Sequence, residues 1–153
     1  MLFGLCTLIG MRLAAKKTER LNIVRSLRKD LVLFSERIAT GGGTLTEIAS
    51  AQNGMLFTML ERYLSALSEG KTESDAAESA AKELKKESTE QAGIRMFLTG
   101  LSAASRADLV KRANALMPML ERAEDDAETE ARQARVVRVS GVLVGAGLAI
   151  LLL

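Results

Sequence analysis

SRADLVKRANALMPMLERAEDDAETEARQAR, residues 105–135, has the pattern of one long amphipathic helix. Ser105 is a good helix cap and Asp108 lies in the first turn, while arginines lie in the last turn, so the charges suit the helix dipole at both ends. Small and apolar residues recur every three or four positions: Leu109, Ala113, Leu116, Leu120, Ala123, Ala127, Ala131 and Ala134. This near-heptad rhythm predicts a helix that buries one stripe against other helices, as in a bundle or a coiled coil.

The preceding residues predict further helices separated by turn signals. Residues 18–39 carry apolar side chains at alternating spacings of three and four, and TGGGT at 40–44 ends this helix because consecutive glycines cost too much backbone entropy. Thr44 followed by Glu47 is a capping-box pattern that opens a short helix. Three more apolar repeats predict a helix that carries Leu56 and runs to Glu69, a helix that begins near residue 72 or 74 and carries apolar residues up to Leu84, and a helix that carries Ile94 and Leu101 and ends at residues 102–105. The predicted fold class is therefore all-α, a bundle of about six helices.

The composition argues against an enzyme. The chain has 153 residues with no histidine and one cysteine, Cys6, which lies in an apolar stretch. Ser-His pairs, Cys-His pairs and histidine-based metal sites are thereby excluded, and we expect no catalysis, cofactor or metal. The acidic run at 121–130 fits a solvated or partner-facing helix surface better than a metal site. A formal net charge of +2 and 3% aromatic residues give no reason to expect nucleic-acid binding.

Both ends of the sequence are apolar. VVRVSGVLVGAGLAILLL, residues 136–153, would span roughly 27 Å as a helix, close to the hydrocarbon thickness of a bilayer. This length predicts a C-terminal transmembrane helix, with a buried core helix as the alternative. Residues 1–15 are short for a span, so a membrane span and an interfacial or core-docked helix both stay open. The expected parts are a short N-terminal membrane segment at 1–15, a helical bundle at 16–135 and the transmembrane helix at 136–153.

Charges next to the two apolar segments indicate the orientation. Basic residues lie on the inner side of both segments, at Lys16, Lys17, Arg20 and Arg25 and again at Arg132, Arg135 and Arg138. By the positive-inside rule, the central part is expected in the cytoplasm. Gly141 and Gly145 form a small-xxx-small pair, which predicts close packing of a second helix in the membrane, although such pairs also occur by chance.

The chain as a whole resembles the stage III sporulation protein AB family, through its architecture and a set of local matches. The matches are Arg20 after the first apolar segment, the Leu27, Leu31 and Ile38 stripe, Gly41 and Leu45 near the first turn, Leu101 and Arg106 before the long helix, and the closing SGVLVGAGLAILLL. The resemblance implies a mother-cell membrane protein of endospore formers, within the complex that joins mother cell and forespore. It also implies a bundle similar to the cytoplasmic domain of the type II secretion platform protein. The implied partners are a cytoplasmic ATPase of the stage III sporulation protein AA type and other membrane proteins of the complex.

We therefore expect a non-enzymatic membrane scaffold that docks the ATPase. Helix lengths place the turn at Gly41, Gly42 and Gly43 at the same end of the bundle as the turn before Arg106, away from the membrane. Loops on a rigid scaffold often carry binding residues, so these four residues are predicted to dock the partner, with plain helix connectors as the alternative. The alternative function is a tail-anchored adaptor, unrelated to secretion, that captures a soluble partner through its acidic helix.

Overall fold

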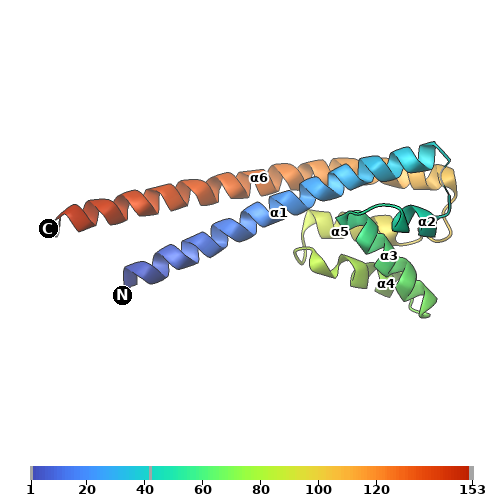
Figure 1. Cartoon of the computed structure of the whole chain (residues 1–153), viewed down its shortest axis with the longest axis horizontal. Coiled ribbons are helices and arrows are strands. Elements are labelled where there is room, and N and C mark those ends of the chain that lie inside the picture. Colours follow the sequence, from blue (N-terminus) through green and yellow to red (C-terminus); the bar gives the residue numbers. More distant parts are fainter. Residues whose placement is uncertain (1, 42, 152–153) are drawn as a thin grey trace. The chain divides into compact units, whose positions relative to one another are not determined.

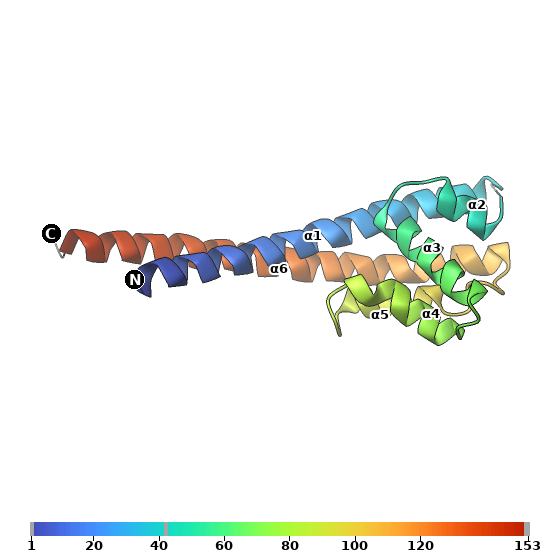
Figure 2. The ribbon, with the colours of Figure 1, turned by 60° about the horizontal axis from the view of Figure 1, so that its bottom comes forward.

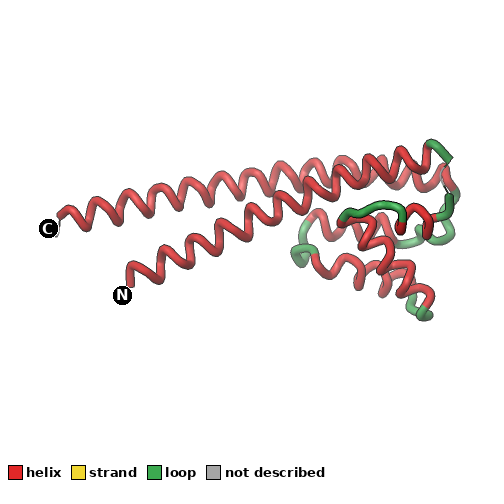
Figure 3. The backbone as a smooth tube through the Cα atoms, viewed as in Figure 1, coloured by secondary structure: helices red, strands yellow, loops and turns green. Residues whose placement is uncertain are grey.

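The computed structural model describes the backbone of residues 2–41 and 43–151 and the side chains of residues 15–41 and 43–136. All regular structure in this part of the chain is helical, which confirms the all-α prediction (Figure 1 and Figure 3). The elements are α1 (Leu2–Ala39), α2 (Leu45–Ser50), α3 (Met55–Ser68), α4 (Glu73–Ala80), the 3-10 helix η1 (Ala81–Glu83), α5 (Thr89–Leu98) and α6 (Arg106–Leu151).

Local signals set several helix ends as the sequence predicts. The Thr44 hydroxyl accepts a hydrogen bond from the Glu47 N–H at 3.3 Å, and the Glu47 carboxylate accepts one from the Thr44 N–H at 2.8 Å. This reciprocal pair is the predicted capping box of α2. Gly70 follows α3 with a φ of +85°, a left-handed conformation that favours glycine after a helix.

Other predicted boundaries are wrong. α1 begins at Leu2 rather than near residue 18, because the apolar segment and the amphipathic part form one uninterrupted helix. The helix predicted over 72–84 divides, with α4 ending at Ala80 and η1 following it. Leu84 then takes an extended backbone, with φ of −77° and ψ of 156°, which stops helical hydrogen bonding. The amphipathic stretch predicted at 105–135 does not end there, because α6 runs from Arg106 to Leu151 as one helix that includes Pro118.

Two compact units divide the chain, and each is described by itself. The terminal unit contains residues 1–22 and 124–153, and the central unit contains residues 23–123. Helices α2 to α5 belong wholly to the central unit, whereas α1 and α6 contribute residues to both.

The core of the central unit is built from the apolar stripes of its helices. Helix α3 packs against α2 and α4, and α4 packs against α5 (Figure 2). Phe34 of α1 meets Phe97 of α5 edge to face, with ring centroids 5.4 Å apart. The whole predicted stripe of α1 is buried: Val24, Leu27, Leu31, Phe34 and Ile38. Burial of each such large side chain contributes about 1.5–3 kcal/mol to folding.

A buried carboxylate joins α1 to the start of α3. Asp30 is buried, and its Oδ2 accepts a hydrogen bond from the Leu56 N–H at 3.0 Å. A Cβ at Gly54 would lie 2.5 Å from the same oxygen, so only glycine leaves room for this approach. Asp30 therefore caps a helix that is far from it in sequence and that has no side-chain cap of its own.

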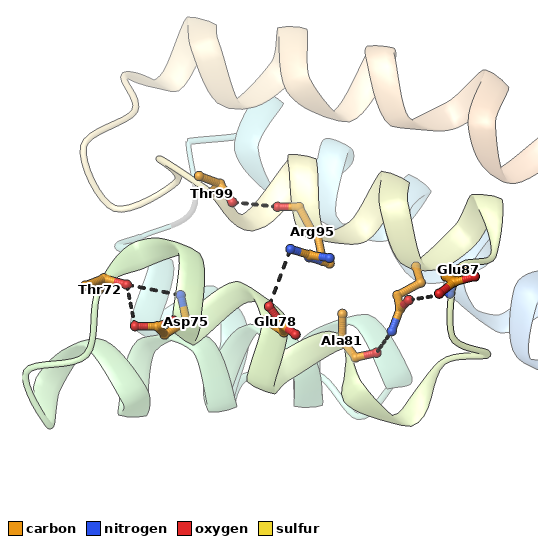
Figure 4. Close-up of polar contacts among 8 residues, drawn as sticks. Thr72, Asp75, Glu78, Ala81, Glu87, Arg95 and Thr99 are labelled. Atoms are coloured by element: carbon orange, nitrogen blue, oxygen red, sulfur yellow. Dashed lines mark hydrogen bonds and ion pairs between the residues drawn. The ribbon is translucent and has the colours of Figure 1, made fainter.

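Polar contacts join α4, η1 and α5 along one side of the central unit, as Figure 4 shows. The Arg95 guanidinium lies 3.5 Å from the Glu78 carboxylate, an exposed pair worth little stability. Gln91 accepts from the Glu87 N–H at 2.9 Å and donates to the Ala81 carbonyl at 3.5 Å. Helix α5 starts at Thr89 because the Ser88 hydroxyl caps it, and it ends at Leu98, before Leu101, which the sequence predicts within this helix.

In the terminal unit, the first part of α1 and the last part of α6 run antiparallel (Figure 1). Arg20 Nη1 donates to Glu130 Oε1 at 2.7 Å, with the two side chains 12% and 32% exposed. Leu21 and Ala127 are buried. A partly buried charge pair beside apolar contacts fixes which residues of the two helices are neighbours.

Within the part of the chain that the structure describes, no helix is both long enough and apolar enough to cross a membrane. The membrane segments predicted at 1–15 and 136–153 lie almost wholly outside the described side chains.

Candidate partner-docking site

The first predicted docking turn connects α1 to α2. Gly41 and Gly43 have φ of +84° and +76°, so both positions favour glycine. The Gly41 N–H donates to the Ile38 carbonyl at 3.2 Å, which closes the end of α1. A Cβ at Gly43 would fall against the Glu47 carboxylate, so this glycine also makes room for the capping box. Gly42 lies outside the described residues.

The second predicted docking turn precedes α6. The Ser105 hydroxyl donates to Asp108 Oδ2 at 2.6 Å, and the Ser105 N–H donates to the same oxygen at 3.2 Å. The Asp108 N–H in turn donates to the Ser105 hydroxyl at 3.2 Å. These hydrogen bonds hold the pKa of the Asp108 carboxyl below its ordinary value and fix the first turn of α6, as the sequence predicts.

The structure brings one residue from each turn together. A Cβ at Gly41 would lie 3.4 Å from Nη1 of Arg106, the first residue of α6. Both residues are exposed, and Arg106 forms no ion pair within the described part of the chain. The exposed guanidinium of Arg106 therefore lies directly over the backbone of the turn at Gly41. We call Gly41 with Arg106 the tip site.

The two glycines predicted to pack in the membrane, Gly141 and Gly145, lie outside the residues whose surroundings the structure describes. Their role stays a prediction.

A groove between α5 and α6 was not predicted from the sequence. It has a volume of about 590 Å³, opens to solvent, and lies between the end of α5, residues 100–104 and the first turns of α6. Its lining includes Met96, Ala103, Lys111, Ala115 and Leu116, and we call it the α5–α6 groove. One signal could have indicated it, because Met96 is apolar yet lies off the α5 stripe formed by Ile94, Phe97 and Leu98.

The acidic run of α6 is a helix surface with some charges paired. Arg132 lies 3.0 Å from Glu128, one turn earlier, and Glu130 pairs with Arg20. Asp125 and Asp126 are exposed. Among the described side chains, no three carboxylate or cysteine groups gather as a metal ion would require.

The fold defines an all-helical protein in which the turn after α1 and the turn before α6 are exposed. Compared with known protein families, the chain matches the model of stage III sporulation protein AB over residues 1–153. The chain belongs to this family and is a protein of the third stage of sporulation, which confirms the resemblance seen in the sequence. No curated protein and no solved structure matches it significantly.

Proposed function

We propose that this sporulation protein is a membrane-anchored scaffold of the complex that joins mother cell and forespore, and that it docks a cytoplasmic ATPase of the stage III sporulation protein AA type. The apolar segments at 1–15 and 136–153 would anchor it in the mother-cell membrane, with the bundle in the cytoplasm. The family supports the sporulation role, and the apolar ends with their basic flanks support the anchoring.

The meeting of Gly41 and Arg106 is the observation that carries the docking proposal. The two residues come from turns far apart in sequence, and together they present a guanidinium that forms no ion pair with the described residues. A guanidinium held in this way is suited to bind a carboxylate of a partner through two parallel hydrogen bonds. The scaffold would act by holding the ATPase in place, without a chemical step of its own.

The test is recovery of the ATPase with the tagged full chain from membranes of sporulating cells. Gly41→Asp would place a carboxylate beside Arg106 and neutralise it, at small backbone cost because aspartate tolerates the left-handed conformation. We expect Gly41→Asp and Arg106→Glu each to lower ATPase recovery about tenfold, because each removes the charge contact and adds a carboxylate that repels the carboxylate of the partner. Gly70→Asp is the matched control, because Gly70 has φ of +85° in an exposed turn with nothing within 4 Å of an added Cβ.

Full ATPase recovery with both tip variants would overturn the docking proposal. If recovery instead fell only when Asp125 and Asp126 were changed to lysine, the exposed acidic surface of α6 would be the docking surface. That result would favour the tail-anchored adaptor, in which the acidic helix captures the partner.

A further inference from the structure

The α5–α6 groove follows α6 for two turns. The α6 residues that line it are Asp108, Lys111, Arg112, Ala115 and Leu116. Their spacing of three and four residues places them on one helix face, about 12 Å long from the first to the last. Ala103 and Ala104 form the adjoining wall, where small side chains leave room for another backbone to approach, whereas the Arg112 guanidinium fills the space beside Gly100.

Met96 is the exposed apolar group at the edge of this groove. Its side chain is 55% exposed, although the neighbouring Phe97 is only 2% exposed. An unbranched methionine adapts its shape to a partner surface, and it is common where helices are captured. Covering this side chain would contribute to binding through apolar burial.

The charged side chains that line the groove differ in how far they are already engaged by other groups of the chain. The Arg112 guanidinium donates to the Thr99 carbonyl at 2.7 Å and to the Met96 carbonyl at 3.4 Å, so it is engaged at the end of α5. The Asp108 carboxylate is engaged by Ser105. Lys111 is exposed and has no ion pair within the described part of the chain. Of the charged side chains that line the groove, Lys111 and Arg112 are basic and Asp108 is acidic, so the net charge of the lining is positive.

We propose that the α5–α6 groove binds an amphipathic helix of the docked partner, with apolar side chains over Met96 and an acidic side chain facing Lys111. This inference rests on the proposed function, in which a soluble protein docks beside Arg106. Ala103 and Ala104 belong to the segment that leads into Arg106, so the groove and the tip site lie near the same end of α6, on different faces of the helix. The elongated shape, the alanine wall and the positive net charge of the lining fit a helix with one acidic edge.

The first experiment uses the full chain in phosphatidylcholine nanodiscs and two synthetic amphipathic helices. The peptides have the same leucine and alanine face and differ only in glutamate or lysine beside it. We expect the glutamate peptide to bind about two- to fivefold more tightly, the value of one exposed ion pair, by fluorescence anisotropy with empty nanodiscs subtracted. Lys111→Glu should reverse this preference.

Two further variants separate the groove from the rest of the surface. Met96→Asp should weaken both peptides about tenfold, because the apolar contact is lost. Lys29→Glu, an exposed lysine of α1 outside the groove, should change neither affinity. Circular dichroism should show unchanged helix content in every variant. The proposal would be overturned if the wild type and Met96→Asp bound the peptides equally well. It would also be overturned if the wild type showed no preference between the peptides but self-associated, and Met96→Asp abolished this self-association. The groove would then bind a second copy of the chain.

ATPase recovery then distinguishes this inference from the proposed function. If ATPase recovery is lost with Met96→Asp as well as with Arg106→Glu, the result supports both the docking proposal and the groove. Loss with Arg106→Glu alone overturns the groove and leaves the docking proposal standing. Loss with neither variant overturns the docking proposal, and the peptide measurements then decide on the groove by themselves.

Discussion

At the scale of single residues, Tyr63 has a buried hydroxyl whose hydrogen bonding is incomplete. It is fully buried, and among the described residues its hydroxyl forms no hydrogen bond of full geometry, although Ser102 and the Leu101 backbone lie close to it. The nearby Ser102 hydroxyl donates to Glu73 instead, at 2.6 Å. Burial raises the pKa of the Tyr63 phenol and the Glu73 carboxylate raises it further, and these effects outweigh the contacts with Ser102 and Leu101 that lower it. An unpaired buried hydroxyl lowers stability, so this position retains a polar group at a cost to the fold.

Tyr63 makes the alkaline stability of the protein testable. Because its pKa is higher in the folded than in the unfolded state, the folded state holds its proton longer, and stability falls as pH rises above the ordinary value near 10 towards the raised value. Tyr63 is the only tyrosine and the chain has no tryptophan, so phenolate absorbance reports this residue alone. Titration of the folded protein at or below pH 10 would contradict the expectation.

Tyr63→Phe removes the unpaired hydroxyl and the titrating proton together. We expect this variant to be as stable as the wild type or up to about 1 kcal/mol more stable at neutral pH. The loss of stability at alkaline pH should also become smaller, as measured by urea unfolding at several pH values. A destabilisation at neutral pH would show that the hydroxyl is hydrogen bonded in solution.

At the scale of elements, Gly93 sets how closely α5 approaches α6. A Cβ at Gly93 would lie 2.9 Å from Leu116 Cδ1 and 3.4 Å from Met119 Cε. Leu116 is 1% exposed, so its side chain has little space into which to move. This approach also brings the end of α5 to the Arg112 guanidinium, and the same two helices form the walls of the α5–α6 groove.

Gly93→Val should therefore destabilise the bundle by about 1–3 kcal/mol, as overpacking of a full core usually does. Ala92→Val is the matched control, because Ala92 is the preceding residue of α5 and is exposed. It should cost only the lower helix propensity of valine, about 0.5 kcal/mol. Equal losses for the two variants in thermal unfolding would mean that α5 and α6 do not pack closely at Gly93.

At the scale of the whole molecule, the orientation in the membrane is the expectation with the largest consequences. Cysteines at Ser68 and Ser79, in a Cys6→Ser background, would lie on exposed positions of α3 and α4. Ser88 is unsuited to this purpose because it is buried and caps α5. If the central part is cytoplasmic, a membrane-impermeant thiol reagent should label neither cysteine in intact cells and both after lysis. Labelling in intact cells would show that the central part lies on the opposite side of the membrane.

The sequence by itself determined the helical class, the stripes of α1 and α6, the capping box at Thr44 and the cap at Ser105. Each of these depends on residues within a few positions of one another, whose spacing and hydrogen-bonding groups act locally. The turn glycines were also recognisable, because no other residue takes their conformation as easily. The start of α1 was not, because an apolar run has no contrast between faces and so does not show that it continues an amphipathic helix.

Only the tertiary structure decided which distant residues meet. The Asp30 cap on α3 and the groove beside Met96 each join elements whose separation in sequence carries no information about distance in space. Helix lengths place Gly41 and Arg106 at the same end of the bundle, but only the structure shows that the two residues are neighbours. These contacts depend on how the stripes of several helices pack together in the core. Packing of that kind follows from the shapes of many side chains at once, which periodicity does not specify.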